Sequence, residues 1–179
     1  SSSILLRNGF NFPIGFAPGF QRASKGNIIL YDPRVLLIDG IIESVGEVHH
    51  ILDYYSKTKE PLLIFARGFS EEVMGTLVVN KLRGALNIIP IAVPYDLAGI
   101  NMLNDIAAVC ETDVISSLKG ELISSIDQEL IASVEKLCLT HNNATLFTDS
   151  KKQSVKVQVN SLIEKRKKLA SGDVQEIID

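Results

Sequence analysis

The sequence predicts a mixed α/β domain built around a parallel βαβαβ unit. Short apolar runs at 62–65, 88–93 and 114–115 alternate with two longer segments of helical character, 71–83 and 97–109. This order repeats about every 25 residues, and strands joined through helices are parallel, with right-handed crossovers. The chain has 179 residues, 46% of them apolar, which is enough for one domain with its own core.

The segments before this unit are less regular. Glycines and prolines are interspersed among four phenylalanines, Phe10, Phe12, Phe16 and Phe20, and their density argues against a long helix or strand in the first thirty residues. Two apolar runs follow, at 28–31 and 35–38, separated by turn-forming Asp32 and Pro33.

Residues 44–57 predict a helix. Its apolar positions recur at spacings of three and four and therefore share one face; they are Val45, Val48, Leu52 and Tyr55. The next helix, from about Glu71 to Arg83, has Ser70 as its expected N-cap and Gly84 just beyond its end.

The remaining elements complete the expected layout. Pro90 interrupts the run at 88–93. Because proline has no backbone N–H to donate, this strand is expected at a sheet edge or with a bulge. Residues 131–148 predict a hairpin that turns at His141-Asn142-Asn143, and 153–169 predict a charged helix that ends before Gly172. We accordingly divide the chain into a domain at 1–152 and a C-terminal helical segment at 153–179.

Composition excludes several classes of protein. Eighteen basic and 21 acidic residues give a net charge of −3, which provides no basic surface for nucleic acid. No apolar run reaches the roughly 18–20 residues of a membrane span, and the start lacks the features of a signal peptide. Cys110 and Cys138 are expected to be buried thiols in a reducing compartment, although a disulfide remains open.

No catalytic, metal or cofactor motif is present in the sequence. The GxGxxG and GxxxxGK[ST] patterns are both missing, and the loop at 66–70 holds only one glycine. His49 and His50 are adjacent, so on a helix they point about 100° apart and do not chelate one metal. A nucleotide- or phosphate-binding α/β enzyme domain nevertheless remains the alternative interpretation.

Apolar residues occur in unexpected places. Phe16 and Phe20 lie in the Gly/Pro-rich segment, and Met74 and Val78 form a second apolar stripe on helix 71–83, beside the Val73–Leu77 face. The pattern by itself is more typical of a core helix, with Val73, Leu77 and Leu82 facing the sheet. The other interpretation is an exposed apolar groove that binds a partner, to which a methionine is well suited.

Several motifs resemble the apical domain of GroEL-type group I chaperonins. They are PLLIFA at 61–66, TLVVNKLRG at 76–84, MLNDIA at 102–107 and VIS at 114–116, together with the aromatic segment from Asn11 to Phe20. The resemblance extends over roughly residues 7 to 175. It implies the swivelling β/β/α fold of chaperonin apical domains and a chaperone that captures non-native polypeptide in an apolar groove between helices 44–57 and 71–83.

The resemblance also implies site residues and partners. The client-binding positions match Phe16, Phe20, His49, Leu52, Met74, Val78, Val79 and Asn80. The whole protein is then expected to be a homo-oligomeric ring that uses ATP and Mg²⁺. A co-chaperonin that closes the ring as a lid is an optional further partner. These 179 residues are expected to be a monomer without catalysis or cofactor, from a bacterial-type or virus-infected cytoplasm or an organelle matrix.

The chain departs from the family pattern at four places. His49 stands where leucine is usual, Gly19 where an aromatic is usual, and Arg67-Gly68 where an acidic pair is usual. The segment 93–98 replaces a basic stretch. The resemblance implies that the last two changes affect contacts between subunits and between domains, and affect peptide capture less. We therefore expect Met74→Glu to abolish client binding with little loss of stability.

Overall fold

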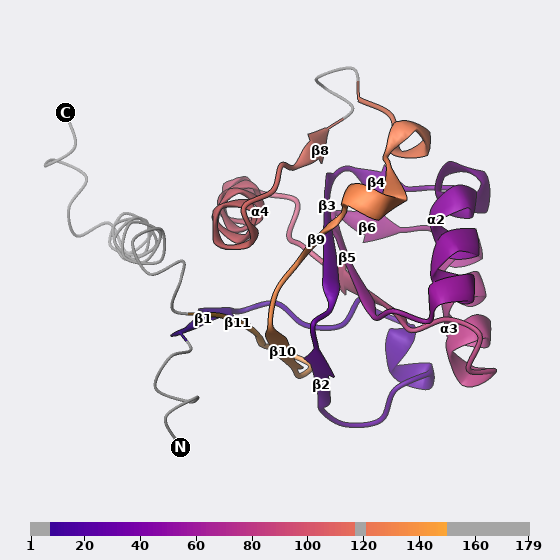
Figure 1. Ribbon diagram of the computed structural model, residues 1–179, viewed down its shortest axis with the longest axis horizontal. Coiled ribbons are helices and arrows are strands. Elements are labelled where there is room, and N and C mark those ends of the chain that lie inside the picture. Colours follow the sequence, from indigo (N-terminus) through magenta and orange to yellow (C-terminus); the bar gives the residue numbers. More distant parts are fainter. Residues whose placement is uncertain (1–7, 117–120, 150–179) are drawn as a thin grey trace, which may run out of the picture.

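The computed structural model describes residues 8–116 and 121–149 (Figure 1). The predicted C-terminal helix at 153–169 and the segment 153–179 lie outside the described residues. Within them, parallel and antiparallel sheets combine with three α-helices. The predicted mixed α/β class is confirmed.

A parallel sheet forms the centre of the molecule. Its strands run in the order β7-β5-β3-β8: β7 (Ile88–Ala92), β5 (Leu62–Ala66), β3 (Arg34–Asp39) and β8 (Ile115–Ser116). The helices α2 (Val45–Thr58) and α3 (Glu71–Leu82) lie on one side of it, and α4 (Leu97–Cys110) lies on the other (Figure 1). The short strand β9 (Ala132–Ser133) pairs antiparallel with β3, and β4 (Ile41–Ile42) pairs with β6 (Gly68–Phe69).

The predicted βαβαβ unit is present, with one topological feature that its pattern did not reveal. The third strand, β8, does not lie beside β7 but pairs in parallel with β3, on the opposite side from β5. The connection through α4 therefore returns across the sheet and places α4 on the face that α2 and α3 leave free. Strand β7 is an edge strand, as Pro90 predicted.

A second, antiparallel sheet lies beside the first. It contains β1 (Asn8–Phe12), β11 (Ala144–Thr148), β10 (Lys136–Leu139) and β2 (Ile28–Tyr31), in that order. The β10–β11 hairpin turns at residues 140–143, as predicted, but residues 132–133 pair with β3 instead of extending it.

Strand β1 corrects the expectation of an irregular start. Phe10 and Phe12 are each 2% exposed and alternate with the exposed Gly9 and Asn11. The strand pairs with β11, more than 130 residues later in the chain. Pairing with a segment so distant in sequence leaves no signal in the local residues. The glycines near β1, in contrast, are a local signal, and they indicate an irregular segment.

Each helix begins at a polar cap, as the sequence indicated for α3. The Ser70 side chain accepts a hydrogen bond from the Val73 amide at 3.2 Å, and the Asp96 carboxylate accepts one from the Gly99 amide at 2.9 Å. At the start of α2 the Glu47 carboxylate accepts a hydrogen bond from the Ser44 amide at 2.8 Å, which satisfies an otherwise unpaired donor.

Cys110 and Cys138 are thiols and not a disulfide pair. Cys110 is buried as expected, whereas Cys138 is only half-buried, since it lies on the less buried face of β10. Among the described residues, no helix combines the length and apolar character needed to cross a membrane.

A buried arginine joins three chain segments at the carboxyl end of the parallel sheet. Arg67 follows β5, and its Nε lies 2.9 Å from Asp39 Oδ1 at the end of β3. Its Nη1 donates to the carbonyls of Pro94 and Asp96, and its guanidinium lies 5.2 Å from the centre of the Tyr95 ring. The departure from the family pattern at Arg67 thus connects β3, β5 and the start of α4.

We predict that Asp39→Ala destabilises the protein by about 3 kcal/mol, because it leaves a buried guanidinium without its counter-ion. The side chains of Arg67 and Asp39 are 3% and 26% exposed. The control is Asp53→Ala, which removes an exposed ion pair with Lys57 and should cost about 0.5 kcal/mol or less. Urea unfolding measures both, and equal losses would show that burial of Arg67 contributes nothing.

A second prediction concerns alkaline pH. Burial raises the pKa of the Tyr55 hydroxyl from 10.0 to about 12. The charge of Arg34 lowers this pKa and the charge of Glu60 raises it, and both effects are smaller than that of burial. The unfolded chain loses this proton at lower pH than the folded chain, so the contribution is full below pH 10 and is lost as the pH rises to about 12. Urea unfolding across this range should show a shallower loss for Tyr55→Phe than for the wild type. An identical slope would contradict the assignment.

Candidate functional site

The α2–α3 surface is set up by the parallel sheet. Helix α2 follows β3 and α3 follows β5, and these two strands are paired neighbours. Their helices therefore lie side by side and contact each other on one face of the sheet (Figure 1). This is the pair of helices that the sequence identified as the walls of a groove.

Most of the predicted client-binding side chains are buried. The exposed fractions are 9% for Phe16, 0% for Phe20, 8% for Leu52, 6% for Met74 and 5% for Val78. Only His49 and Val79 are exposed, and Asn80 is half-buried. The expectation that Met74 and Val78 form an exposed stripe is therefore wrong for this structure.

Helical geometry explains this burial. Each residue turns the helix by about 100°, so Leu77, Met74 and Val78 lie about 40°, 100° and 140° from Val73. The sheet side takes Val73 and Leu77, which are 2% and 1% exposed. The rest of this wide apolar arc needs a different cover, which the sequence pattern did not identify.

The cover is the aromatic segment near the N-terminus. It forms the short helix η1 (Phe20–Arg22), which contacts α3. A Cβ built on Gly19 would lie only 3.3 Å from Met74 Cγ. The Phe16 and Phe20 rings stack with centroids 6.2 Å apart, and His141 meets Phe16 edge-on at 5.7 Å. Phe16, Phe20 and Met74 are thus brought together, but in a closed arrangement.

The exposed apolar side chains of α3 are Val79 and Leu82, at 43% and 65%. Leu82 was expected to face the sheet, and that expectation is wrong. It follows Val73 by nine residues, which places it about 180° away on a helical wheel. Wheel angles, applied residue by residue, were the signal that could have identified Leu82.

The polar residues of the site have identifiable partners. His50 Nε2 donates to the Ile126 carbonyl at 3.0 Å, so only His49 of the histidine pair remains exposed, as expected for this pair. The Asn80 side chain donates to the Thr76 carbonyl at 2.8 Å. Lys81 Nζ lies 2.8 Å from Asn87 Oδ1, and burial lowers the pKa of Lys81.

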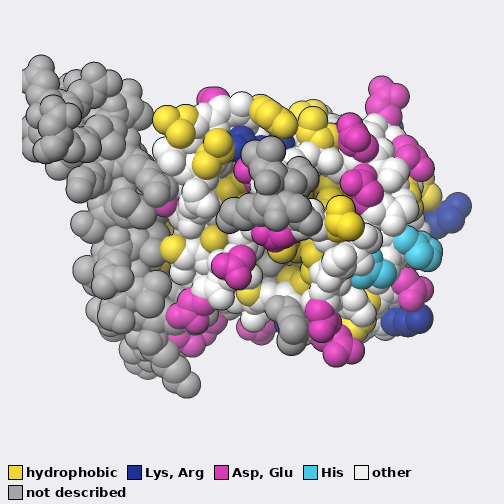
Figure 2. Space-filling model, turned by 90° about the horizontal axis from the view of Figure 1, so that it is seen from above, with side chains coloured by type: hydrophobic (Ala, Val, Ile, Leu, Met, Phe, Trp, Pro, Cys, Tyr) yellow, Lys and Arg dark blue, Asp and Glu magenta, His cyan; other side chains and the backbone are white. Residues whose placement is uncertain are grey.

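Charge is distributed unevenly along both helices. Glu47, Glu71 and Glu72 occupy the first turns, and Lys57 and Lys81 the last turns, as the helix dipoles favour. Figure 2 looks onto the carboxyl end of the parallel strands and shows acidic and histidine side chains on the side where α2 lies. Among the described residues, no group of three His, Cys, Asp or Glu side chains is arranged to hold a metal.

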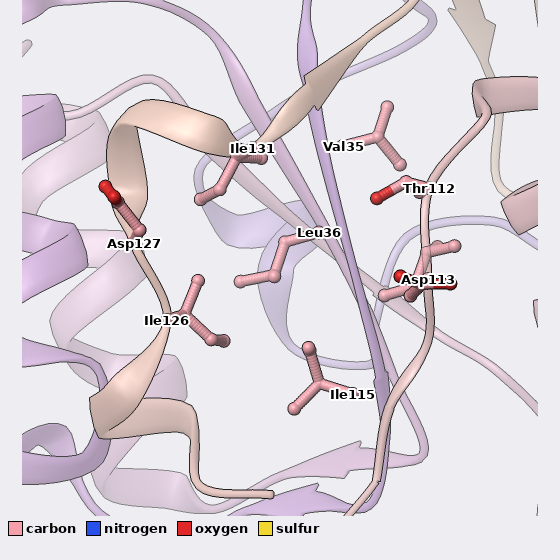
Figure 3. Close-up of a pocket in the computed structure, with 9 residues that line it drawn as sticks. Val35, Leu36, Thr112, Asp113, Ile115, Ile126, Asp127 and Ile131 are labelled. Carbon is pink, nitrogen blue, oxygen red and sulfur yellow. The ribbon is translucent and has the colours of Figure 1, made fainter.

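A cavity of about 230 Å³ lies apart from these residues (Figure 3). The side chains of Leu36, Ile115, Ile126 and Ile131 converge on it, with Asp113 and Asp127 at its margin. No predicted client-binding residue lines it. The cavity therefore lies against β3, β8 and the segment 126–131, and does not belong to the α2–α3 surface.

Comparison with known proteins places this fold in a family. No protein-family model matches the chain. It is 30% identical over 174 residues, 95% of its length, to the chloroplastic RuBisCO large subunit-binding protein subunit alpha of Chlamydomonas reinhardtii. The chaperonin gp146 of bacteriophage EL 2 superimposes with a TM-score of 0.59 at 20% identity over 89% of the chain. The chain spans only 30% of the first protein and 33% of the second. Sequence and fold together show that these residues form a GroEL-type chaperonin-like domain.

Proposed function

We propose that this chain is the apical, polypeptide-binding domain of a molecular chaperone and captures non-native segments over α2 and α3. The observation that carries the proposal is the pair of exposed apolar side chains on α3, Val79 at 43% and Leu82 at 65%. Exposed apolar surface on a helix pair accepts the apolar face of an amphipathic segment. Of the other expected client-binding residues, His49 is exposed on α2 and Asn80 is half-buried on α3, while Phe16, Phe20, Leu52, Met74 and Val78 are buried.

Binding of this kind needs little specificity. A client segment that buries about 400 Å² of apolar surface gains roughly 10 kcal/mol before ordering costs, at about 25 cal/mol/Å². Most of that gain is offset by lost chain and side-chain freedom. The proposal therefore implies affinities of roughly micromolar strength for one domain, which a ring of domains would raise through multivalency.

The rest of the proposal concerns the whole protein. As a chaperonin subunit it would assemble into a homo-oligomeric ring and use ATP and Mg²⁺ in a domain outside these residues, while this domain binds clients without catalysis. A co-chaperonin would compete for the same surface. The ring would work in a bacterial-type or virus-infected cytoplasm or in an organelle matrix, as the chloroplastic location in its relative's name illustrates.

The first binding prediction compares exposed apolar side chains on α3 with one on α4. Leu82→Ser and Val79→Ser should each weaken binding of a fluorescent amphipathic peptide by roughly tenfold, about 1.4 kcal/mol, because each removes apolar surface from the proposed site. Leu97 on α4 is 71% exposed, so Leu97→Ser is a matched control and should leave the affinity unchanged. Fluorescence anisotropy measures all four proteins.

The opposite pattern contradicts the proposed site. If Leu97→Ser weakens the peptide and Leu82→Ser does not, the binding surface lies near α4 instead. If neither the wild type nor the variants Phe20→Ala and Gly26→Ala bind the peptide at concentrations up to about 100-fold above the micromolar expectation, the proposed capture function is wrong for this domain.

A further prediction concerns stability and revises the expectation for Met74→Glu. Met74 is 6% exposed, so a carboxylate there should lower the free energy of unfolding by roughly 3 kcal/mol. Val79→Glu, on the exposed arc of the same helix, should change it by about 0.5 kcal/mol or less. Thermal melts of both variants test this difference, and equal melting temperatures would show that Met74 is accessible in solution.

A further inference from the structure

The segment between β1 and β2 contains a fully buried aromatic side chain within a largely exposed stretch. Phe20 is 0% exposed, whereas Pro18, Gln21, Arg22 and residues 25–27 are exposed. We call residues 18–27 the flap. The flap therefore contributes one large apolar side chain to the interior and little else.

The hydrogen bonds of the flap are local. Phe20 donates its amide to the Ala17 carbonyl, Ala23 donates to the Phe20 carbonyl, and the Arg22 side chain donates to the Gly19 carbonyl. Within residues 8–116 and 121–149, all the hydrogen bonds found for the flap stay within residues 17–23. Contact between the flap and α3 therefore rests on side-chain packing, which is not directional.

The chain is fixed on both sides of the flap. Before it, the Ala17 amide donates to the Pro90 carbonyl at 2.9 Å and Phe16 bridges to Ile91. After it, β2 pairs with β10. Gly19 and Gly26 have φ angles of 97° and 88°, a region that other residues adopt only at a cost. These glycines are natural hinge points for a flap held at both ends.

Phe20 lies beside the part of α3 that would otherwise bind a client. Its helix η1 contacts α3, and Gly19 lies against Met74. Met74 points away from the sheet-facing side of α3, so the flap is part of what covers it. Displacing Phe20 would leave an apolar pocket next to the exposed Val79–Leu82 surface.

We propose that Phe20 occupies, from within the same chain, the pocket that takes the aromatic anchor of a bound polypeptide, so that client binding displaces the flap. This rests on the proposed function, in which the α2–α3 surface binds polypeptides. The preferred ligand is an amphipathic segment with a phenylalanine on its apolar face, because that side chain matches the one already buried there. The closed flap lowers the apparent affinity for the client, which equals the intrinsic affinity multiplied by the fraction of molecules whose flap is open.

The test measures binding of two fluorescent peptides that differ only by Phe or Ala at the centre of the apolar face. Phe20→Ala should bind the Phe peptide roughly tenfold more tightly than the wild type, as expected when a competitor filling about nine sites in ten is removed. The Ala peptide should gain much less. Weaker binding of the Phe peptide by Phe20→Ala would overturn the proposal, since Phe20 would then contact clients itself.

A second variant opens the flap without removing its aromatic ring. Gly26→Ala introduces strain at a φ of 88° and meets no atom within 4 Å, so it should also tighten binding of the Phe peptide. Gly84→Ala is the matched control, because Gly84 has a φ of 71° and equally open surroundings outside the flap. If Gly26→Ala and Gly84→Ala have the same affinity as the wild type, the flap does not compete with clients.

A spectroscopic readout follows the flap directly. The chain contains no tryptophan, so Phe20→Trp reports from a single site. Its emission should be that of a buried indole and should shift to longer wavelength when the Phe peptide is added. Emission that stays unchanged at saturating peptide would overturn displacement.

The two proposals fail differently. If the wild type binds the peptide and Leu82→Ser weakens it, but both flap variants match the wild type, only the flap proposal is wrong. If neither the wild type nor either flap variant binds, the proposed polypeptide capture is wrong and the flap proposal falls with it. Binding by Phe20→Ala and Gly26→Ala alone supports a flap that is closed in nearly all molecules.

Discussion

Burial of β3 between two helical layers is the constraint on which the rest of this structure depends. Its four central residues, Val35, Leu36, Leu37 and Ile38, are at most 5% exposed. The strand pairs in parallel with β5 and β8 and antiparallel with β9, and it connects directly to β2 in the second sheet. A strand apolar on both faces must be covered on both, and that requirement places α2 and α3 on one side and α4 on the other.

The same arrangement creates the candidate binding surface. Paired strands β3 and β5 bring α2 and α3 together, and α3 is apolar over a wider arc than a sheet alone can cover. Part of the excess is buried beneath the Phe16–Phe20 segment, and part, at Val79 and Leu82, is exposed. The proposed capture of polypeptides depends on the part of this surface that stays open.

Polar interactions act mainly at the ends of the strands. Arg67 links Asp39 at the end of β3 to the carbonyls of Pro94 and Asp96 before α4. A ring contact also joins distant segments, because the β10–β11 turn brings His141 against Phe16. These contacts join segments distant in sequence, so they determine how the two sheets and three helices pack rather than whether each element forms.

The sequence by itself determined the α/β class, the main helices and most strands, since apolar spacing, Ser70 and Pro90 are local signals. The same holds for the chaperonin resemblance, which rests on contiguous motifs such as PLLIFA and TLVVNKLRG. Only the tertiary structure decided that β1 is a strand, that β8 pairs with β3, and that Met74 and Val78 are buried. The physical reason is that strand pairing and burial depend on residues far away in the chain. Helix α3 displays the same apolar side chains whether or not Phe20 packs against them, so its own sequence does not specify which of them water reaches.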